Sequence, residues 1–176
     1  MTMSRKSLSP VLGALFAAAL CACTDANAKG ASDKVAQHLA TFDDLDFNVY
    51  THQKWDELGK SHAKDIVVHY PDGHTTKGLP DHIAELKGMW VFAPDNRIVE
   101  HPIKFGHGDY TAVTGSLLGS FTQPMPTADG KSIPPTGKAY KLPMATIGHW
   151  NKDGVMDEEY LYWDNSAFMK QIGLAP

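Results

Sequence analysis

Hydrophobic side chains recur at helical spacing in the N-terminal half of the chain. Val35 and Phe42 lie on the apolar face of a helix that we expect to begin at Asp33, a residue type that caps helix N-termini. Residues 53–62 and 81–92 have the same helical character. The pattern therefore predicts three N-terminal helices.

The remaining segments are rich in β-branched and aromatic residues, and Gly or Pro clusters separate them. The first predicted strand covers residues 65–70 and ends at a Pro-Asp-Gly turn. An antiparallel meander should follow, with strands at residues 97–105, 110–122, 139–150 and 155–164. Helices that precede strands favour an α+β domain, in which helices cover one face of a curved antiparallel sheet. A short C-terminal helix is expected after the last strand.

A proline-rich stretch at residues 123–137 interrupts the meander. Long loops in compact domains are often functional. Two interpretations remain open for it: a long hairpin tip that covers the mouth of a pocket, or a rigid loop without such a role.

The first 28 residues have the parts of an export signal: basic Arg5 and Lys6, an apolar run, and small residues. Two cleavage sites compete. Residues 20–23 form a bacterial lipobox, which would attach a lipid to Cys23. Residues 26–28 form an A-x-A site for ordinary secretion with cleavage after Ala28. We favour the lipobox, which places the protein on the periplasmic side of the cell envelope with a lipid anchor in the membrane.

This interpretation divides the 176 residues into a signal peptide at 1–22, a flexible tether at 23–32 and one domain at 33–174. No cysteine follows Cys23, so no disulfide cross-links the domain. The net charge of the chain is −4, and the leader contains two basic residues and no acidic one. An acidic domain is a poor partner for nucleic acid.

Three sequence motifs resemble the SnoaL-like branch of the NTF2-like superfamily, which includes polyketide cyclases and ester cyclase-like proteins. They are AKDIVVHYPDG, PDHIAELK and DGVMDEEYLYWDNSAFMKQIGL. The resemblance implies a cone-shaped fold with a deep pocket between sheet and helices, a small hydrophobic ligand or substrate, and a homodimer formed through the exposed sheet face. The family's cyclases use a pocket aspartate near the end of the last strand, helped by a histidine. A common family pattern, DGKIVEHWDVWD, has two aspartates after its glycine, which fall on Leu161 and Asp164.

Alternation along the last strand places residues 157, 159, 161 and 163 on one face and residues 158, 160, 162 and 164 on the other. If the first face looks into the cone, Glu159 is the inward carboxylate, and its burial should raise its pKa. If the second face does, Asp164 lies there with Tyr160 and Tyr162. Asp164 also stands where a helix N-cap belongs, which would be a structural role.

Nine histidines stand in the chain, and their spacing matches no short metal-binding signature, so we predict no metal site. His149 is the expected partner of a carboxylate across the last hairpin, as an acid/base pair. Candidate ligand-binding residues are His69, His74, Trp90, His101, Tyr160, Tyr162 and Trp163.

Two functions remain open. The first is acid/base chemistry of the cyclase, isomerase or hydrolase type on a small hydrophobic carbonyl compound, catalysed by Glu159 or Asp164 with His149. Such chemistry needs a positioned base and hydrogen-bond donors, but no cofactor. The second is a non-catalytic, ligand-binding lipoprotein that holds the same kind of molecule.

Overall fold

The computed structural model describes the backbone of residues 14–176 and the side chains from residue 29 onward. Most of the expected signal peptide lies outside these residues. The helices are α1 (Ala14–Asp44), η1 (Leu45–Tyr50), η2 (Trp55–Lys60), α2 (Leu79–Phe92) and α3 (Asn165–Gln171). The strands are β1 (His62–His69), β2 (Thr75–Lys77), β3 (Arg97–Ile98), β4 (Ile103–His107), β5 (Tyr110–Ser120), β6 (Met125–Pro126), β7 (Ser132–Ile133), β8 (Ala139–Trp150) and β9 (Met156–Trp163).

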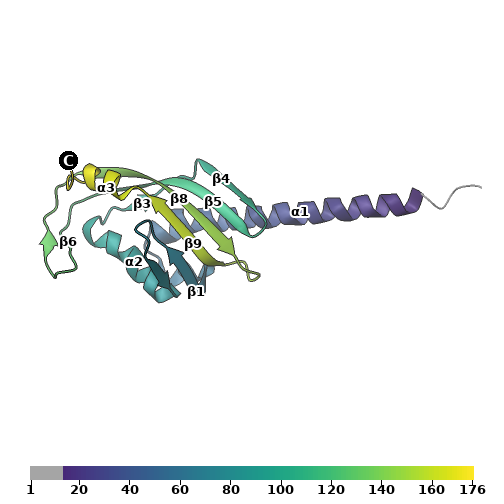
Figure 1. Ribbon diagram of the computed structural model, residues 1–176, viewed down its shortest axis with the longest axis horizontal. Helices are drawn as coiled ribbons and strands as arrows, with labels where there is room; N and C mark the ends of the chain where they lie inside the picture. Colours follow the sequence, from purple (N-terminus) through teal and green to yellow (C-terminus); the bar gives the residue numbers. More distant parts are fainter. Residues whose placement is uncertain (1–13) are drawn as a thin grey trace, which may run out of the picture.

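Seven strands form one curved sheet in the order β2-β1-β9-β8-β5-β3, with β4 also paired to β5. All neighbours are antiparallel except β1 and β9, which run parallel. In Figure 1 the sheet curves over the helices, with α2 beside β1. The structure is the predicted α+β cone, and the parallel pairing places its first strand, β1, next to the last hairpin.

Two clusters of buried side chains fill the space between sheet and helices. One surrounds Phe42 of α1, Trp150 of β8 and Met156 of β9. The other surrounds Phe92 of α2 and Phe121, beside α3. Burial of large apolar side chains is the main favourable contribution to folding, and the two clusters leave room between them for a cavity.

The sequence prediction for residues 139–150 matches β8 at both ends. The strand expected at residues 97–105 is instead two short strands, β3 and β4, because the chain crosses there from one part of the β5 edge to another. The proline-rich stretch carries the small β6–β7 hairpin, and Met125 and Ile133 in it pack against the core cluster around Phe92.

Helix α1 continues through residues 23–32, where the sequence predicts a flexible tether, and through Asp33, where it predicts an N-cap. Six alanines in residues 18–31 explain this difference, because alanine has the highest helix propensity. Residues 29–32 are exposed, and α1 extends well beyond the sheet (Figure 1). Cys23 lies in this helix, but its side chain is outside the described ones.

Within residues 14–176, no helix combines the length and the apolar character needed to cross a membrane.

Candidate active site

A cavity of about 320 Å³ lies between the concave face of the sheet and the helices. This volume is within the usual range for small-molecule sites. Most of its wall is apolar and is formed by Leu45, Leu86, Met89, Ile98, Leu117, Leu142, Met144, Leu161, Trp163 and Phe168. Its buried polar groups include Asp46, His62, His82 and Glu159. The cavity therefore suits an apolar molecule that carries a polar group.

Glu159 is the carboxylate that β9 directs into this cavity. The residue is 4% exposed and lies in the middle of the sheet, opposite Val68 of β1 and Gly148 of β8. Leu161 and Trp163, two and four positions further along β9, line the same cavity. For residues 159, 161 and 163 the structure therefore selects the first of the two strand faces that the alternation allowed, whereas an irregular register beside Trp150 places Asp157 with His149 on the other face.

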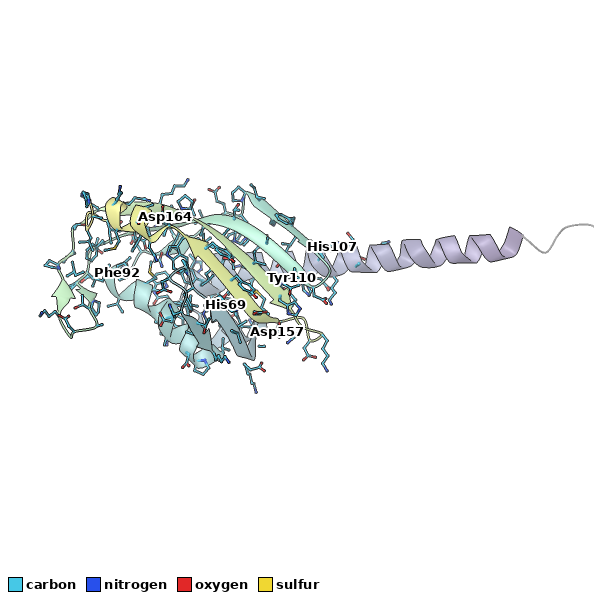
Figure 2. All side chains as sticks on the ribbon, viewed as in Figure 1. His69, Phe92, His107, Tyr110, Asp157 and Asp164 are labelled. Atoms are coloured by element: carbon cyan, nitrogen blue, oxygen red, sulfur yellow. The ribbon has the colours of Figure 1, made fainter. Side chains whose placement is uncertain are left out.

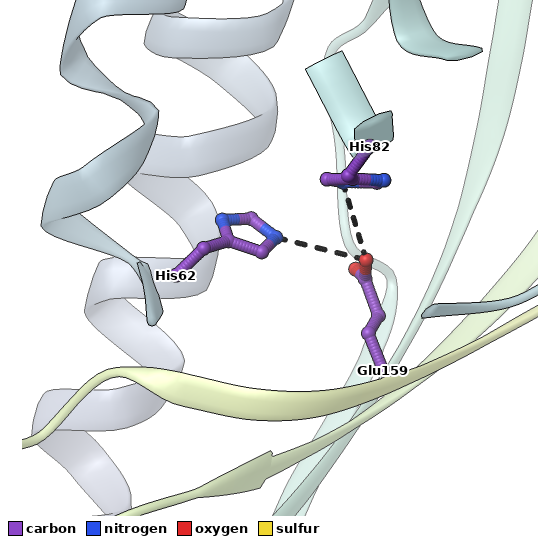
Figure 3. A group of neighbouring side chains, drawn as sticks. All are labelled: His62, His82 and Glu159. Carbon is purple, nitrogen blue, oxygen red and sulfur yellow. Dashed lines mark ion pairs between the residues drawn. The ribbon is translucent and has the colours of Figure 1, made fainter. Parts of the chain in front are cut away.

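Two histidines from different elements flank this carboxylate (Figure 3). His62 begins β1, and His82 lies in the first turn of α2, which follows the left-handed Gly78 (φ 92°). Their Nε2 atoms are 3.6 Å and 3.5 Å from Oε2 of Glu159, respectively. All three side chains are almost fully buried, so their interactions are not screened by solvent.

The charge states of this group differ from the sequence expectation. Burial would raise the pKa of Glu159, but the two imidazoles outweigh burial and hold it below its usual range. The sequence prediction of a raised pKa was therefore wrong, because it did not include His62 and His82. Burial also lowers the pKa of His82 to about 4. At neutral pH Glu159 is ionised and His82 is neutral.

A second buried carboxylate, Asp46 of η1, also lines the cavity. Its Oδ2 is 2.8 Å from Nε2 of His101, and Nδ1 of the same ring is 2.9 Å from Oδ1 of Asp43. Burial raises the pKa of Asp46 even though His101 hydrogen-bonds to it, and the charge of Glu159 adds to this effect. The two cavity carboxylates are thus shifted in opposite directions.

Several predicted site residues lie on the outer face of the sheet instead. His149 does meet a carboxylate across the hairpin, because its Nδ1 is 2.6 Å from Oδ1 of Asp157. His69 pairs with Glu158 and stacks on Tyr160, and the ring centroids are 4.3 Å apart. Figure 2 labels His69 and Asp157 in this part of the sheet.

The remaining predicted site residues lie partly at the cavity and partly at the surface. Asp164 is exposed and accepts hydrogen bonds from the backbone N–H groups of Ser166 and Ala167, so it caps α3 (Figure 2). Trp163 lines the cavity, and His74 lies on its exposed rim. The other predicted site residues are absent from the cavity wall in the part of the chain that the structure describes: Trp90, Tyr160, Tyr162, His69, His101, His149 and Asp164.

Sequence reasoning missed Asp46, His62 and His82 as site residues. They come from three elements that are far apart in the sequence, and no local spacing links them to Glu159. The parallel β1–β9 pairing brings His62 close to Glu159, and this pairing was not predicted. The usable signal was the position of His82 in the first turn of a helix next to a strand.

His62, His82 and Glu159 could also hold a metal ion, because their potential ligand atoms all lie within 4.8 Å of one another. Two histidines and one glutamate form a donor set found in catalytic zinc sites. The sequence expectation of no metal site considered only local spacings, and such spacings cannot reveal a group assembled from three elements.

Comparisons with known proteins agree with this architecture. A protein from Jannaschia sp. CCS1, described as a SnoaL-like polyketide cyclase, superposes with a TM-score of 0.68 at 19% identity, over 81% of this chain and 95% of that one. IdmH from Streptomyces antibioticus, also described as a polyketide cyclase, gives 0.66 at 20% identity, over 78% and 99%.

A third structure, described as a polyketide cyclase from Xanthomonas campestris pv. campestris, gives a TM-score of 0.66 at 14% identity, over 80% of this chain and 99% of that one. No curated protein is significantly similar to the chain. At these identities the structures establish the fold alone. The model of the SnoaL-like polyketide cyclase family matches residues 46–172, most of the chain, and the chain therefore belongs to this family.

Proposed function

We propose that the protein catalyses acid/base chemistry of the cyclase or isomerase type on a small hydrophobic carbonyl compound. Membership of a polyketide cyclase family supports this class of reaction. The observation that carries the proposal is a buried, ionised carboxylate, Glu159, in a largely apolar cavity. The cavity can exclude water from the reacting group.

The opposite shifts of the two carboxylates suggest their roles, since acid and base are distinguished by environments that push their pKa values apart. Glu159, ionised, would accept a proton from the carbon next to the carbonyl group. Asp46, which shares a proton with His101 and has a raised pKa, would present that proton to the oxygen on which negative charge develops. His82, neutral, adds a polar group beside the base without a charge.

Proton exchange tests this proposal without knowledge of the natural substrate. Aryl β-diketones in D₂O should gain deuterium at the carbon between the carbonyl groups faster with the wild-type protein than without it, as followed by NMR. Glu159→Gln should reduce this rate by at least about 100-fold, because it removes the base but keeps its shape. His149→Gln, on the outer face, is the matched control and should exchange at the wild-type rate.

The melting temperature of each variant shows whether the fold survives. Wild-type exchange in folded Glu159→Gln protein would overturn the assignment of the base. Binding of the diketones without any exchange would instead favour a non-catalytic ligand-binding protein, for which Leu161 at the family's aspartate position is the supporting observation.

The protein is also proposed to be anchored at the periplasmic side of the envelope by a lipid on Cys23. The lipobox at residues 20–23 supports this, and the exposed helical segment that follows would hold the domain away from the membrane. Cys23→Ser should move the protein from the membrane fraction to the soluble fraction. Retention in the membrane fraction would reject the lipid anchor.

A further inference from the structure

A pair of buried atoms in the cavity lacks hydrogen-bond partners. Among the described side chains, these unsatisfied atoms include Nε2 of His62 and Oε2 of Glu159, which face each other. A buried polar atom without a partner costs about 1–3 kcal/mol, so such atoms call for an explanation.

The surroundings of His62 define what its Nε2 atom offers. Nδ1 of the same ring is 3.3 Å from the carbonyl oxygen of Leu58 and 2.9 Å from Oγ of Ser61. Oγ of Ser61 donates its proton to the carbonyl oxygen of Leu58, so it accepts a hydrogen bond from Nδ1 of His62, which carries a proton. Nε2, the other ring nitrogen, faces the carboxylate of Glu159 at 3.6 Å, and no hydrogen bond joins the two groups.

His82 completes the group from the helix side. Its Nδ1 is 3.0 Å from the hydroxyl oxygen of Tyr70, and its Nε2 is directed toward Oε2 of Glu159 (Figure 3). Histidine ligands of metals characteristically have such an outer partner on the second ring nitrogen, because it fixes the ring orientation and the tautomer. Both histidines in this group have one.

The distances favour a metal ion over a proton between these atoms. At 3.5 Å and 3.6 Å, the two N–O separations are longer than N–H···O hydrogen bonds, which span 2.7–3.2 Å. Ligand atoms about 2.0–2.2 Å from a tetrahedral zinc ion lie about 3.4 Å apart. The observed separations are close to this value.

We infer that His62, His82 and Glu159 bind one divalent transition-metal ion of the Zn²⁺ type, with its remaining coordination position open to the apolar cavity. Three protein ligands and one open position are the arrangement of catalytic rather than structural zinc sites. A carbonyl or carboxylate oxygen of a hydrophobic molecule could occupy the open position.

The metal site is inferred independently of the proposed reaction. Only one of its consequences rests on the proposed function. Oε2 of Glu159 would be both the metal ligand and the atom that accepts the substrate proton. The ion and the proton therefore compete for the same oxygen, and Zn²⁺ should suppress the deuterium exchange of chelator-treated protein.

Metal titration of the full chain, purified and freed of metal with a chelator, tests the inference. Zn²⁺ should bind with one ion per chain in isothermal titration calorimetry, and Co²⁺ should give the visible absorption spectrum of a tetrahedral site. His82→Ala and Glu159→Gln should each weaken Zn²⁺ binding by more than about 100-fold, which exceeds the usual effect of losing an outer partner. The matched control is His69→Ala, because His69 forms an ion pair with Glu158 on the outer face of the sheet.

If His82→Ala does not fold, Tyr70→Phe provides the test, because it removes only the outer hydrogen-bond partner of His82. It should weaken Zn²⁺ binding by about 10–100-fold. Absence of stoichiometric binding, or equal affinities in the wild type, Glu159→Gln and Tyr70→Phe, would overturn the metal site. If the protein has no metal site, the deuterium exchange that metal-free protein catalyses in the diketone is unaffected, so the two proposals are tested separately.

Discussion

At the scale of single residues, the environment of each ionisable group decided its role more than its position in the chain. Strand alternation gave Glu159 as one of two candidate carboxylates, because it showed that only one face of β9 can look into the cone but not which one. The direction of its pKa shift could not be predicted, since two histidines distant in sequence cause it. Asp164 and His149 were plausible in sequence but have partners outside the cavity.

The buried His101 gives a pH dependence that can be measured. Burial lowers its pKa, but Asp46 and Asp43 outweigh burial and raise it above the ordinary value of 6.5. Lys104, the remaining nearby charge, pairs with Asp43. Because the folded protein binds the proton more tightly, this stabilisation is complete below pH 6.5 and is lost as the pH rises through the folded pKa.

Urea unfolding at several pH values above 6.5 should therefore show wild-type stability falling more steeply than that of His101→Gln. His69→Gln, which changes a half-exposed histidine, provides the comparison. Parallel slopes for the wild type and His101→Gln would show that His101 does not gain proton affinity on folding.

At the scale of secondary structure, periodicity predicted the elements that pack by one face. The strand at residues 139–150 and the helix that became α2 were predicted well, because their patterns are long and regular. The parallel β1–β9 pairing left no local signal, since strand pairing depends on the whole chain path. The extension of α1 through residues 23–32 was missed because a single glycine and several polar residues were given more weight than the alanines.

The short helix α3 provides a test of the role of Asp164. Its side chain accepts two backbone hydrogen bonds, so Asp164→Ala should lower the free energy of unfolding by about 1 kcal/mol. Asp164→Asn should retain nearly all stability, since asparagine also caps helices. Both variants should catalyse deuterium exchange of the diketone at the wild-type rate. Loss of exchange with unchanged stability would show instead that Asp164 takes part in catalysis.

At the scale of the whole molecule, the outer face of the sheet exposes large apolar side chains. Ile103 and Phe105 of β4, Tyr110 of β5 and Tyr162 of β9 are each at least half exposed. The strand registers place them on one side of the sheet. Exposed large apolar side chains on one face of a sheet favour association, and we propose that two copies of the chain pair through this face.

The dimer proposal predicts that Phe105→Lys shifts the protein from dimer to monomer in size-exclusion chromatography with light scattering. A lysine buried in the interface would lose its hydration without a partner. Val91→Lys, which changes a half-exposed apolar residue on α2, should leave the dimer intact. A monomeric wild type, or dimeric Phe105→Lys protein, would exclude pairing through this face.

The central claim is that ligands meet His62, His82 and Glu159 inside the cavity, and not the histidine–carboxylate pairs on the outer face. The most direct measurement is the imidazole ¹⁵N NMR spectrum during titration with an aryl β-diketone. We expect the signals of His62 and His82 to shift while those of His69 and His149 stay in place. Shifts confined to His69 and His149 would contradict this assignment.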